Sequence, residues 1–442
     1  MELSRTDFPT GFMFGTATSA YQIEGHAAGD AGPCHWDSFA ATPGNVTNAA
    51  DGRIACDHYH RFHEDLDLVA AAGFDLYRFS TSWARVMPDG VGVNHAGLDF
   101  YDRLIDAILA CNLKPALTLY HWELPATLAD RGGWANRETA ERFAEFAALM
   151  ASRFGDRVWS WATINEPWCV SWLSHFEGAH APGLRDIRAT ARAMHHVGLA
   201  HGLGLAALRT GGTRNLGVVL NFEPARPADG STEAIAAVDR HDAIYNRFFV
   251  EAMTQGGYPD TALEGLERHL PHRWQADMAT IRAPLDWLGV NFYTIRRVAA
   301  GPGAWPAWRT AAPRGQTTDI GWEIAPEALT GVLTWLVHQY TGALPLMVTE
   351  NGMAARDVLR DGTLRDDDRI AYLAAHLNAA RAAIAAGVPL KGFVIWSLLD
   401  NYEWAFGYSK RFGLVHVDFD TFQRTPKASY HALARMLKGT TP

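Results

Sequence analysis

The sequence has few cysteines and no long apolar run. Its four cysteines form no C-x-x-C pair, so neither a zinc knuckle nor a disulfide framework is indicated in a chain of this length. We expect reduced, mostly buried thiols. A run of about 18 apolar residues is absent, and the first residues lack a basic start followed by an apolar stretch. These absences predict no membrane segment and a cytoplasmic location.

Long runs of one charge sign are absent as well. The formal net charge of -9 is spread along the chain, which argues against a surface that binds phosphate backbones. We therefore expect no nucleic-acid partner. Apolar residues make up 48% of the chain, enough for a large core, so disordered and fibrous classes are excluded. α/β barrels of this length form one domain, and we expect a single domain over residues 1–442.

Short apolar segments rich in β-formers recur along the chain, each followed by a longer segment with helical spacing. This alternation is typical of βαβ units with a parallel sheet. Eight rounds favour a (β/α)8 TIM barrel over an open doubly wound sheet. The eight predicted strands cover residues 12–18, 76–82, 114–121, 159–167, 214–222, 286–293, 345–352 and 391–399. The Gly- and Pro-rich segment Val298 to Thr317 is predicted to be a long loop that shapes a pocket.

Three other patterns have simpler explanations than ligand binding. Residues 202–207 match a dinucleotide fingerprint, but they lie inside a predicted helix rather than between a strand and a helix. His58, His60 and His63 lack metal-site spacing and accompanying ligands, so we expect helix-packing histidines and no metal. The acidic run at residues 366–368 is expected to cap a helix. No cofactor is predicted.

Polar residues gather at the C-terminal ends of five predicted strands. One such residue is explained by a cap or a structural hydrogen bond, but five groups at one barrel mouth indicate a site. Two carboxylates among them, Glu166 and Glu350, suit cleavage of a glycosidic bond, with their roles interchangeable at this point. The groups are His121-Trp122-Glu123, Asn165-Glu166-Pro167, Asn291-Phe292-Tyr293, Glu350-Asn351-Gly352 and Asp400-Asn401-Tyr402-Glu403-Trp404.

The motifs, in their order, resemble those of the family 1 glycoside hydrolases, which include bacterial and plant β-glucosidases. The likeness extends from Phe12 to about His431. Its motifs are FMFGTATSAYQIEG, RFSTSW, YHWELP, TINEPW, NFY, TDIGWEI, VTENG, WSLLDNYEW and RFGLVHVDF.

The resemblance implies roles for individual residues. Glu166 resembles the family's acid/base and Glu350 its nucleophile. Arg78 and Tyr293 resemble the partners of that nucleophile, with Asn291 supporting the same site. Trp168 and Phe412 would lie nearer the leaving group. The implied substrate-binding residues are Gln22, His121, Asn165, Asn291, Tyr293, Trp396, Glu403 and Trp404, with Trp396 as the platform beneath the sugar ring.

Elementary electrostatics agrees with this division of roles. An arginine beside Glu350 favours its charged form, whereas burial and a neighbouring negative charge should raise the pKa of Glu166. Once a glycosyl-enzyme forms, the charge on Glu350 is lost, and Glu166 can release its proton to become the base of the second step. The resemblance thus implies a retaining mechanism.

Two retained residues narrow the expected substrate. Glu403 would repel the phosphate of a 6-phosphorylated sugar, and Glu166 is the carboxylate that the thioglucosidase branch has lost. We expect small β-glucosides or cello-oligosaccharides, with galactosides and fucosides as further substrates. The sequence leaves open transfer to an acceptor instead of water, a catalytically silent sugar-binding barrel, and assembly into a homo-oligomer.

Overall fold

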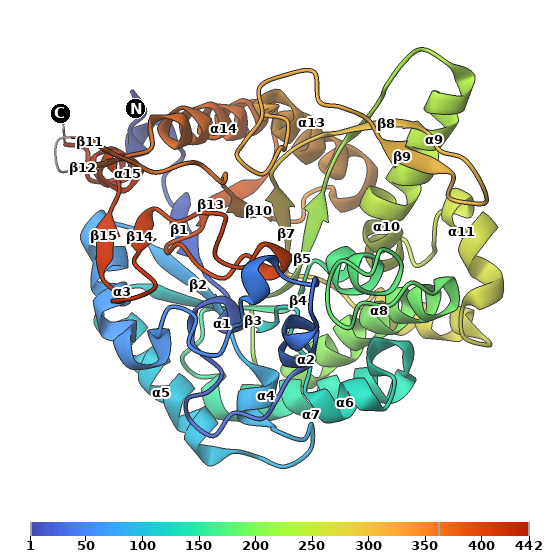
Figure 1. Cartoon of the computed structure of the whole chain (residues 1–442), viewed down its shortest axis with the longest axis horizontal. Helices are drawn as coiled ribbons and strands as arrows, with labels where there is room; N and C mark the ends of the chain where they lie inside the picture. Colours follow the sequence, from blue (N-terminus) through green and yellow to red (C-terminus); the bar gives the residue numbers. More distant parts are fainter. Residues whose placement is uncertain (1, 361–362, 441–442) are drawn as a thin grey trace.

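Eight parallel strands close into a barrel in this computed structural model, which describes residues 2–360 and 363–440 (Figure 1). Around the barrel the order is β1-β13-β10-β7-β5-β4-β3-β2. Each strand begins within two residues of a predicted one, which confirms the (β/α)8 prediction. The strands are β1 (Met13–Ala17), β2 (Leu76–Ser80), β3 (Lys114–Tyr120), β4 (Ser160–Asn165), β5 (Leu216–Phe222), β7 (Trp287–Phe292), β10 (Leu346–Asn351) and β13 (Leu390–Trp396).

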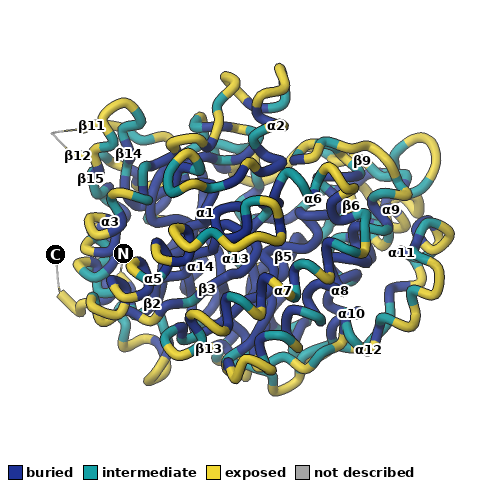
Figure 2. The backbone as a smooth tube through the Cα atoms, turned by 90° about the horizontal axis from the view of Figure 1, so that it is seen from below, coloured by how far each residue is buried: buried dark blue, intermediate teal, exposed yellow. Residues whose placement is uncertain are grey.

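The barrel strands are apolar on both faces because both faces are covered. Every residue of β2, β4, β5, β7 and β10 is buried, and the strands form the dark interior of Figure 2. One face packs inside the barrel and the other against the surrounding helices, so the two-residue alternation of a half-exposed strand is absent. This explains why continuous apolar runs identified the strands.

Amphipathic helices surround the barrel, and polar caps fix where several begin. The side chains of Asn94, Asn136 and Asp186 accept hydrogen bonds from the first turns of α5, α7 and α8. The longer helices are α3 (His58–Ala72), α5 (His95–Ala110), α7 (Arg137–Phe154), α8 (Ile187–Thr210), α9 (Thr232–Asp242), α13 (Pro326–Leu336), α14 (Asp367–Ala385) and α15 (Ala428–Lys438). The shorter ones are α1 (Ala20–Ile23), α2 (His35–Ala41), α4 (Trp83–Val86), α6 (Ala126–Asp130), α10 (Phe248–Thr254), α11 (Asp260–Leu266) and α12 (Met278–Ile281).

The segment after the sixth barrel strand is not the unstructured loop predicted for Val298 to Thr317. β8 (Arg296–Ala300) and β9 (Trp308–Thr310) pair antiparallel there, and β6 (Ala225–Pro227) extends them to a three-stranded sheet. β8 is only partly buried and β9 has three residues, so neither shows the continuous apolar run of a barrel strand. Two further hairpins complete the fold, β11 (Val358–Arg360) with β12 (Thr363–Arg365) and β14 (Val415–Val417) with β15 (Arg424–Pro426).

The residues that match a dinucleotide fingerprint, and one of the three histidines considered as metal ligands, have structural roles. Residues 202–207 lie inside α8, where a Cβ on Gly202 would come within 2.0 Å of the Thr280 carbonyl oxygen. That glycine therefore permits close helix contact. On α3, His58 is buried and its Nδ1 lies 2.7 Å from Asp65 Oδ2, whereas His60 and His63 are exposed rather than packed.

The predicted acidic cap is only partly correct. Asp367 and Asp368 lie in the first turn of α14. The Asp366 side chain does not cap this helix; it accepts hydrogen bonds from the Ser429 amide and hydroxyl and pairs with Arg369. Burial of Asp366 beside an arginine outweighs capping, because a buried carboxylate requires a cationic partner.

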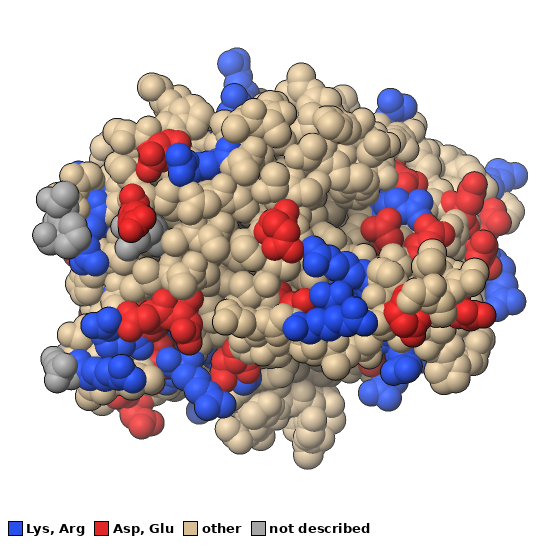
Figure 3. All heavy atoms as spheres, turned by 90° about the horizontal axis from the view of Figure 1, so that it is seen from above, with Lys and Arg blue, Asp and Glu red and all other residues tan. Residues whose placement is uncertain are grey.

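The surface mixes charges of both signs. On the face in Figure 3, acidic and basic side chains lie interspersed among larger neutral areas. Among the described residues, no helix combines the length and apolar character needed to cross a membrane. Near the two ends of the chain, Arg5 Nε donates to the Leu437 carbonyl oxygen at 3.1 Å, so the first turn docks against α15.

Candidate active site

Local backbone irregularities aim the polar residues at the strand ends. The register of β4 against β5 shifts between Ala162 and Asn165, and that of β10 against β7 shifts between Val348 and Glu350. Such irregularities turn a side chain out of the strand's regular alternation. Glu166, directly after β4, has a φ of 51°, a left-handed conformation that is uncommon and costly outside glycine. The barrel thus holds these carboxylates in conformations that an isolated strand would not adopt.

A cavity of about 310 Å³ opens at this end of the barrel. Most of the predicted site residues line it. Arg78, Asn165 and Gln22 are buried and stand outside the lining. The predicted residues in the wall are His121, Glu166, Trp168, Asn291, Tyr293, Glu350, Trp396, Glu403, Trp404 and Phe412.

Both oxygens of Glu350 receive hydrogen bonds. Arg78 Nη1 lies 2.5 Å from Oε1, and the Tyr293 hydroxyl donates to Oε2 at 2.6 Å. Arg78 is itself buried and also donates to the Thr349 carbonyl oxygen at 3.3 Å. A guanidinium from β2 and a phenol from the residue after β7 therefore fix the orientation of this carboxylate.

Glu166 has a different environment, although it too has a donor on each oxygen. Asn291 Nδ2 donates to Oε1 at 2.6 Å, and the Cys169 thiol donates to Oε2 at 3.0 Å. Burial, and next the charge on Glu350, raises the pKa of Glu166 to about 7, against the opposing effect of these hydrogen bonds and of Arg78. Glu166 therefore holds a proton near neutral pH, as expected from the sequence.

One amide connects the two carboxylates. Asn165 Oδ1 accepts from Arg78 Nη2 at 2.8 Å and from Asn291 Nδ2 at 3.1 Å. Since guanidinium can only donate, the orientation of the Asn165 amide is determined, and so is that of Asn291. Asn291, which the resemblance implied as a support of this site, thus contacts Glu166 directly.

Three buried polar atoms in the wall have no hydrogen-bond partner among the described residues: His121 Nδ1, Trp168 Nε1 and Glu403 Oε2. His121 Nε2 faces Asn165 Nδ2 at 3.2 Å, so it accepts, and Nδ1 carries the hydrogen. Burial, then the charge on Arg78, keeps the pKa of His121 well below its usual range. Burial, then Glu350 and Glu166, raises the pKa of Glu403 to about 8. The wall thus presents two unpaired N–H donors, on His121 and Trp168, and one unpaired carboxyl oxygen, on Glu403.

Aromatic rings form the walls at both ends of the cavity. Trp396 stacks on His121 with centroids 5.7 Å apart, and Trp404 lies 4.8 Å from Trp122. At the other end, Trp168 lies 4.0 Å from Tyr245. Phe412 completes the wall beside Tyr293 and Trp322. Flat apolar faces beside a few polar atoms match the two faces of a pyranose ring.

Gln22 lies deeper than the resemblance implied. Its Nε2 donates to Asn401 Oδ1 at 3.0 Å and to the Tyr402 carbonyl oxygen at 2.8 Å, while Ser19 Oγ donates to its Oε1 at 2.5 Å. The side chain is fully buried. In this structure Gln22 therefore anchors the segment that carries Glu403 and Trp404.

Several wall residues were not predicted from the sequence. Cys169 follows Glu166 by one helical turn, a spacing that could have signalled contact. Trp122 and Trp322 belong to recognised motifs without an assigned role. Glu223 and Arg296 form a bidentate ion pair in the wall, but they are 73 residues apart and only the folded barrel joins them. Asn221, His180, Glu177 and Tyr245 also line the cavity.

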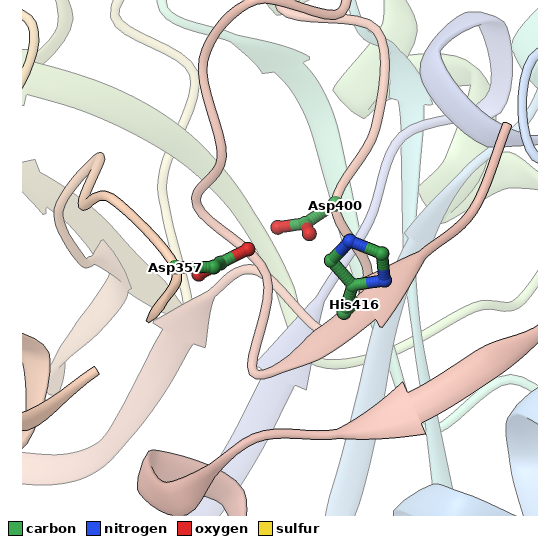
Figure 4. A group of neighbouring side chains, drawn as sticks. All are labelled: Asp357, Asp400 and His416. Atoms are coloured by element: carbon green, nitrogen blue, oxygen red, sulfur yellow. The ribbon is translucent and has the colours of Figure 1, made fainter. Parts of the chain in front are cut away.

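A second group of possible ligands lies outside the cavity. The ligand atoms of Asp357, Asp400 and His416 all lie within 4.8 Å of one another, with the two carboxylates facing each other (Figure 4). Lys427 Nζ already lies 3.0 Å from Asp357 Oδ1 and 2.7 Å from Asp400 Oδ1. Arg411 Nη1 contacts Asp400 Oδ2 at 2.8 Å. These cations neutralise the carboxylates and occupy the position that a metal would take.

A (β/α)8 barrel with two carboxylates in contrasting environments at the mouth, between aromatic walls, defines a glycosidase. A sequence profile of glycosyl hydrolase family 1 matches residues 4–439. The chain belongs to this family.

Characterised relatives are similar to this chain over nearly its whole length. Beta-glucosidase A of Thermotoga maritima is 44% identical over 438 residues, which span 98% of this chain and 98% of that protein. The bifunctional β-D-glucosidase/β-D-fucosidase of Bifidobacterium breve is 42% identical, covering 97% and 98% of the two chains. The Thermotoga maritima β-glucosidase solved in complex with glucoimidazole is 42% identical, with a TM-score of 0.94 and 98% of each chain covered.

Proposed function

We propose that this protein is a retaining β-glucosidase that releases the terminal β-D-glucosyl residue from the non-reducing end of small β-glucosides or cello-oligosaccharides. The observation that carries the proposal is the contrast between two carboxylates in one cavity. Arg78 and Tyr293 hold Glu350 as an oriented anion, whereas burial raises the pKa of Glu166 to about 7. One group is suited to attack carbon and the other to carry a proton.

In the first step, Glu350 attacks the anomeric carbon while Glu166 protonates the glycosidic oxygen. The bond from that carbon to the oxygen breaks, and its electron pair stays with the leaving group, which departs as an alcohol. Glu350 becomes an ester of the sugar and loses its charge. Because the charge on Glu350 contributes to the raised pKa of Glu166, esterification makes Glu166 easier to ionise.

In the second step, the ionised Glu166 takes a proton from water as the water oxygen attacks the anomeric carbon. The ester bond breaks with its electron pair returning to Glu350, and the configuration at the anomeric carbon is retained after two inversions. Glu166 ends protonated and Glu350 ionised, so both groups are restored for the next cycle.

The sugar is proposed to lie on Trp396 between the unpaired atoms of the wall. His121 Nδ1 donates to one hydroxyl and Glu403 Oε2 accepts from another, which satisfies two buried atoms that have no partner among the described residues. Trp404 and Asn165 complete the contacts with the sugar hydroxyls. Gln22 would reach the sugar only if its hydrogen bonds to Asn401, Tyr402 and Ser19 rearranged. Trp168 and Phe412 are proposed to contact the leaving group.

Glu403 also narrows the sugar to an unphosphorylated one, because an acidic side chain at this position offers a phosphate no cation and its ionised form would repel one. The relatives carry β-glucosidase names, one with β-fucosidase activity besides. We therefore include fucosides, and by the same reasoning galactosides, as secondary substrates. Nothing in the relatives' names favours transfer to an acceptor as the main reaction.

Azide rescue of carboxylate variants tests the two roles. Glu350→Ala and Glu166→Ala should each lower kcat on an aryl β-glucoside by about 100-fold or more. Azide should then restore turnover, giving the α-glucosyl azide with Glu350→Ala, because azide replaces the nucleophile. It should give the β-glucosyl azide with Glu166→Ala, because azide replaces the attacking water.

Glu177→Ala is the matched control, because Glu177 is an exposed carboxylate at the cavity wall with no part in the chemistry. Its product should be unchanged by azide. Exchanged azide anomers would show that the two roles are reversed. Wild-type turnover no faster than that of Glu350→Ala would instead indicate a silent sugar-binding barrel.

We further propose a cytoplasmic location. All four cysteines are free thiols, which suits a reducing compartment. Fractionation of the native cells should find the activity with cytoplasmic markers, and recovery outside the cell would contradict this location.

A further inference from the structure

Cys169 contacts the acid/base carboxylate directly. It is the first residue of a five-residue π-helical turn, Cys169–Leu173, a rare form of helix that recurs at functional sites. The buried thiol lines the cavity with Sγ 3.0 Å from Glu166 Oε2. Asn221 Nδ2, which also lines the cavity, donates to Sγ at 3.6 Å. Two polar groups therefore orient the sulfur toward Glu166.

The hydrogen-bond network determines which oxygen of Glu166 carries the proton. Arg78 can only donate, so the oxygen of the Asn165 amide must face it, and the nitrogen of Asn291 must face that oxygen. The Asn291 oxygen accepts from the Thr349 hydroxyl at 2.8 Å, which agrees with this orientation. Asn291 therefore donates to Glu166 Oε1 and has no lone pair to offer a proton there. The remaining oxygen, Oε2, faces the thiol.

We propose that the transferable proton of Glu166 resides on Oε2, and that Cys169 is a positioning residue whose hydrogen bond to this oxygen reverses between the two steps. The thiol accepts from Oε2–H while Glu166 is the acid, and it donates to Oε2 while Glu166 is the base. A thiol can do both because it is a donor and an acceptor. This inference rests on the proposed function of Glu166.

The proton transfers in both steps balance while the thiol stays protonated throughout. In the first step, the proton leaves Oε2 for the glycosidic oxygen, and the S–H bond rotates toward the new carboxylate. In the second step, water gives a proton to Oε2 and the S–H bond turns away. Burial, and next the charge on Glu166, raises the pKa of Cys169 well above its usual range, so the thiol does not compete as a base.

Other charged or titratable groups also act on Glu166, and they remain in the variants that test Cys169. Among them, Glu350 favours the protonated form of Glu166, and Arg78 the ionised form. The interactions of Glu166 with the remaining groups raise the pKa values of those groups. They are Tyr245, Tyr293 and Glu403.

Cys169→Val and Cys169→Ser separate the hydrogen bond from the volume of the side chain. Valine fills the site but cannot donate, so the ionised form of Glu166 loses a partner and its pKa rises. The basic limb of the kcat/KM profile should move to higher pH by half a unit or more. Breakdown of the glycosyl-enzyme, measured after the burst with a dinitrophenyl β-glucoside, should slow by about 3- to 10-fold. Serine keeps both functions and should remain within about twofold of wild type.

Cys111→Val is the matched control, since Cys111 is a half-buried thiol at the end of α5, and it should leave both measurements unchanged. If Cys169→Val does not fold, Cys169→Ala makes the same test. Equal effects of serine and valine, or a wild-type profile with valine, would overturn the proposal.

A double variant distinguishes this inference from the proposed function. In a Glu166→Ala background, adding Cys169→Val should not change the rate of β-glucosyl azide formation, because the thiol acts only through Glu166. A further loss would show a packing role and overturn the inference. An absent or reversed azide pattern in Glu166→Ala itself would instead refute the assignment of Glu166 and leave no carboxylate for Cys169 to position.

Discussion

At the residue scale, the orientation of Glu350 depends on two donors of different kinds. Arg78 supplies a charge and Tyr293 a neutral hydroxyl. Arg78 also bonds Asn165 and the Thr349 carbonyl oxygen, so its removal would disturb several contacts at once. Among the described residues, the Tyr293 hydroxyl makes one hydrogen bond, to Glu350, so Tyr293 is the cleaner residue to change.

Tyr293→Phe removes the hydroxyl from Glu350 Oε2 and keeps the ring. A hydrogen bond to a charged group contributes about 1.5–3 kcal/mol, so we expect kcat/KM to fall by about 10- to 100-fold. Steady-state kinetics on an aryl β-glucoside measures the loss, and thermal unfolding should be nearly unchanged.

Tyr340→Phe is its control. The Tyr340 hydroxyl also donates to a carboxylate, Glu251 Oε1 at 3.1 Å, but outside the cavity. Full activity in Tyr293→Phe, or an equal loss in both variants, would contradict a specific role for Tyr293.

The sequence identified residues whose importance follows from position at a strand end, such as Glu166 and Glu350. It did not identify contacts that depend on how side chains meet in space. The bond from Cys169 to Glu166 and the double acceptance by Asn165 Oδ1 follow from distances between strands. The contact of Asn291 with Glu166 was not predicted for the same reason.

At the element scale, β10 and β13 approach each other closely at their C-terminal ends. A Cβ on Gly352, directly after β10, would lie 1.7 Å from the carbonyl oxygen of Trp396. Glycine is required there for close approach of two backbones rather than for an unusual φ. This contact joins the strand end that carries Glu350 to the one that carries Trp396.

Gly352→Ala should force these two strand ends apart. Overpacking of a rigid contact costs about 3 kcal/mol, so we expect the free energy of unfolding in urea to fall by about that amount. The rate kcat should fall as well, because Trp396 and Glu350 are displaced relative to each other.

Gly331→Ala is the matched control on an exposed position of α13, where a Cβ would meet nothing within 4 Å. It should stabilise the helix by up to about 1 kcal/mol and leave kcat unchanged. Wild-type stability and activity in Gly352→Ala would show that the two strands can move apart freely.

Helices and strands were predictable from the sequence where burial imposes a clear local pattern of apolar residues. Barrel strands covered on both faces gave apolar runs that marked all eight of them. β8 and β9 were missed because short strands at the rim have one exposed face and few residues. The side chain of Asp366 escaped a local prediction because its partner, Ser429, lies 63 residues away.

At the scale of the whole molecule, several histidines are buried in neutral form. Burial lowers the pKa of His35 and His201 to about 3 and that of His175 and His376 to about 4. In the unfolded chain a histidine has a pKa near 6.5. Between about pH 6.5 and these lower values, the unfolded chain binds protons that the folded protein does not, so stability falls as the solution is acidified.

His201→Gln tests this contribution. His201 is fully buried, with Nδ1 2.7 Å from the Thr163 hydroxyl. Each such histidine adds about 1.4 kcal/mol per pH unit to the slope of stability against pH. Urea unfolding between pH 6 and pH 4 should show a slope lower by about that amount in His201→Gln. His63→Gln, at an exposed position, is the control and should leave the slope as in wild type. A wild-type slope in His201→Gln would show that burial of His201 does not contribute to the pH dependence of stability.

The closure of the barrel by β1 and β13 has a consequence for synthesis on the ribosome. Thr16 pairs with Ile395, so 379 residues must be added before the first strand meets its last neighbour. At about 5–20 residues per second this takes roughly 20–75 s. Trp396, Glu403 and Trp404 arrive last, so a nascent chain that already carries Glu166 and Glu350 still lacks the part of the cavity wall that is proposed to receive the sugar. Activity therefore begins only when translation is nearly finished, and a chain interrupted before β13 contributes no partial enzyme to the cell.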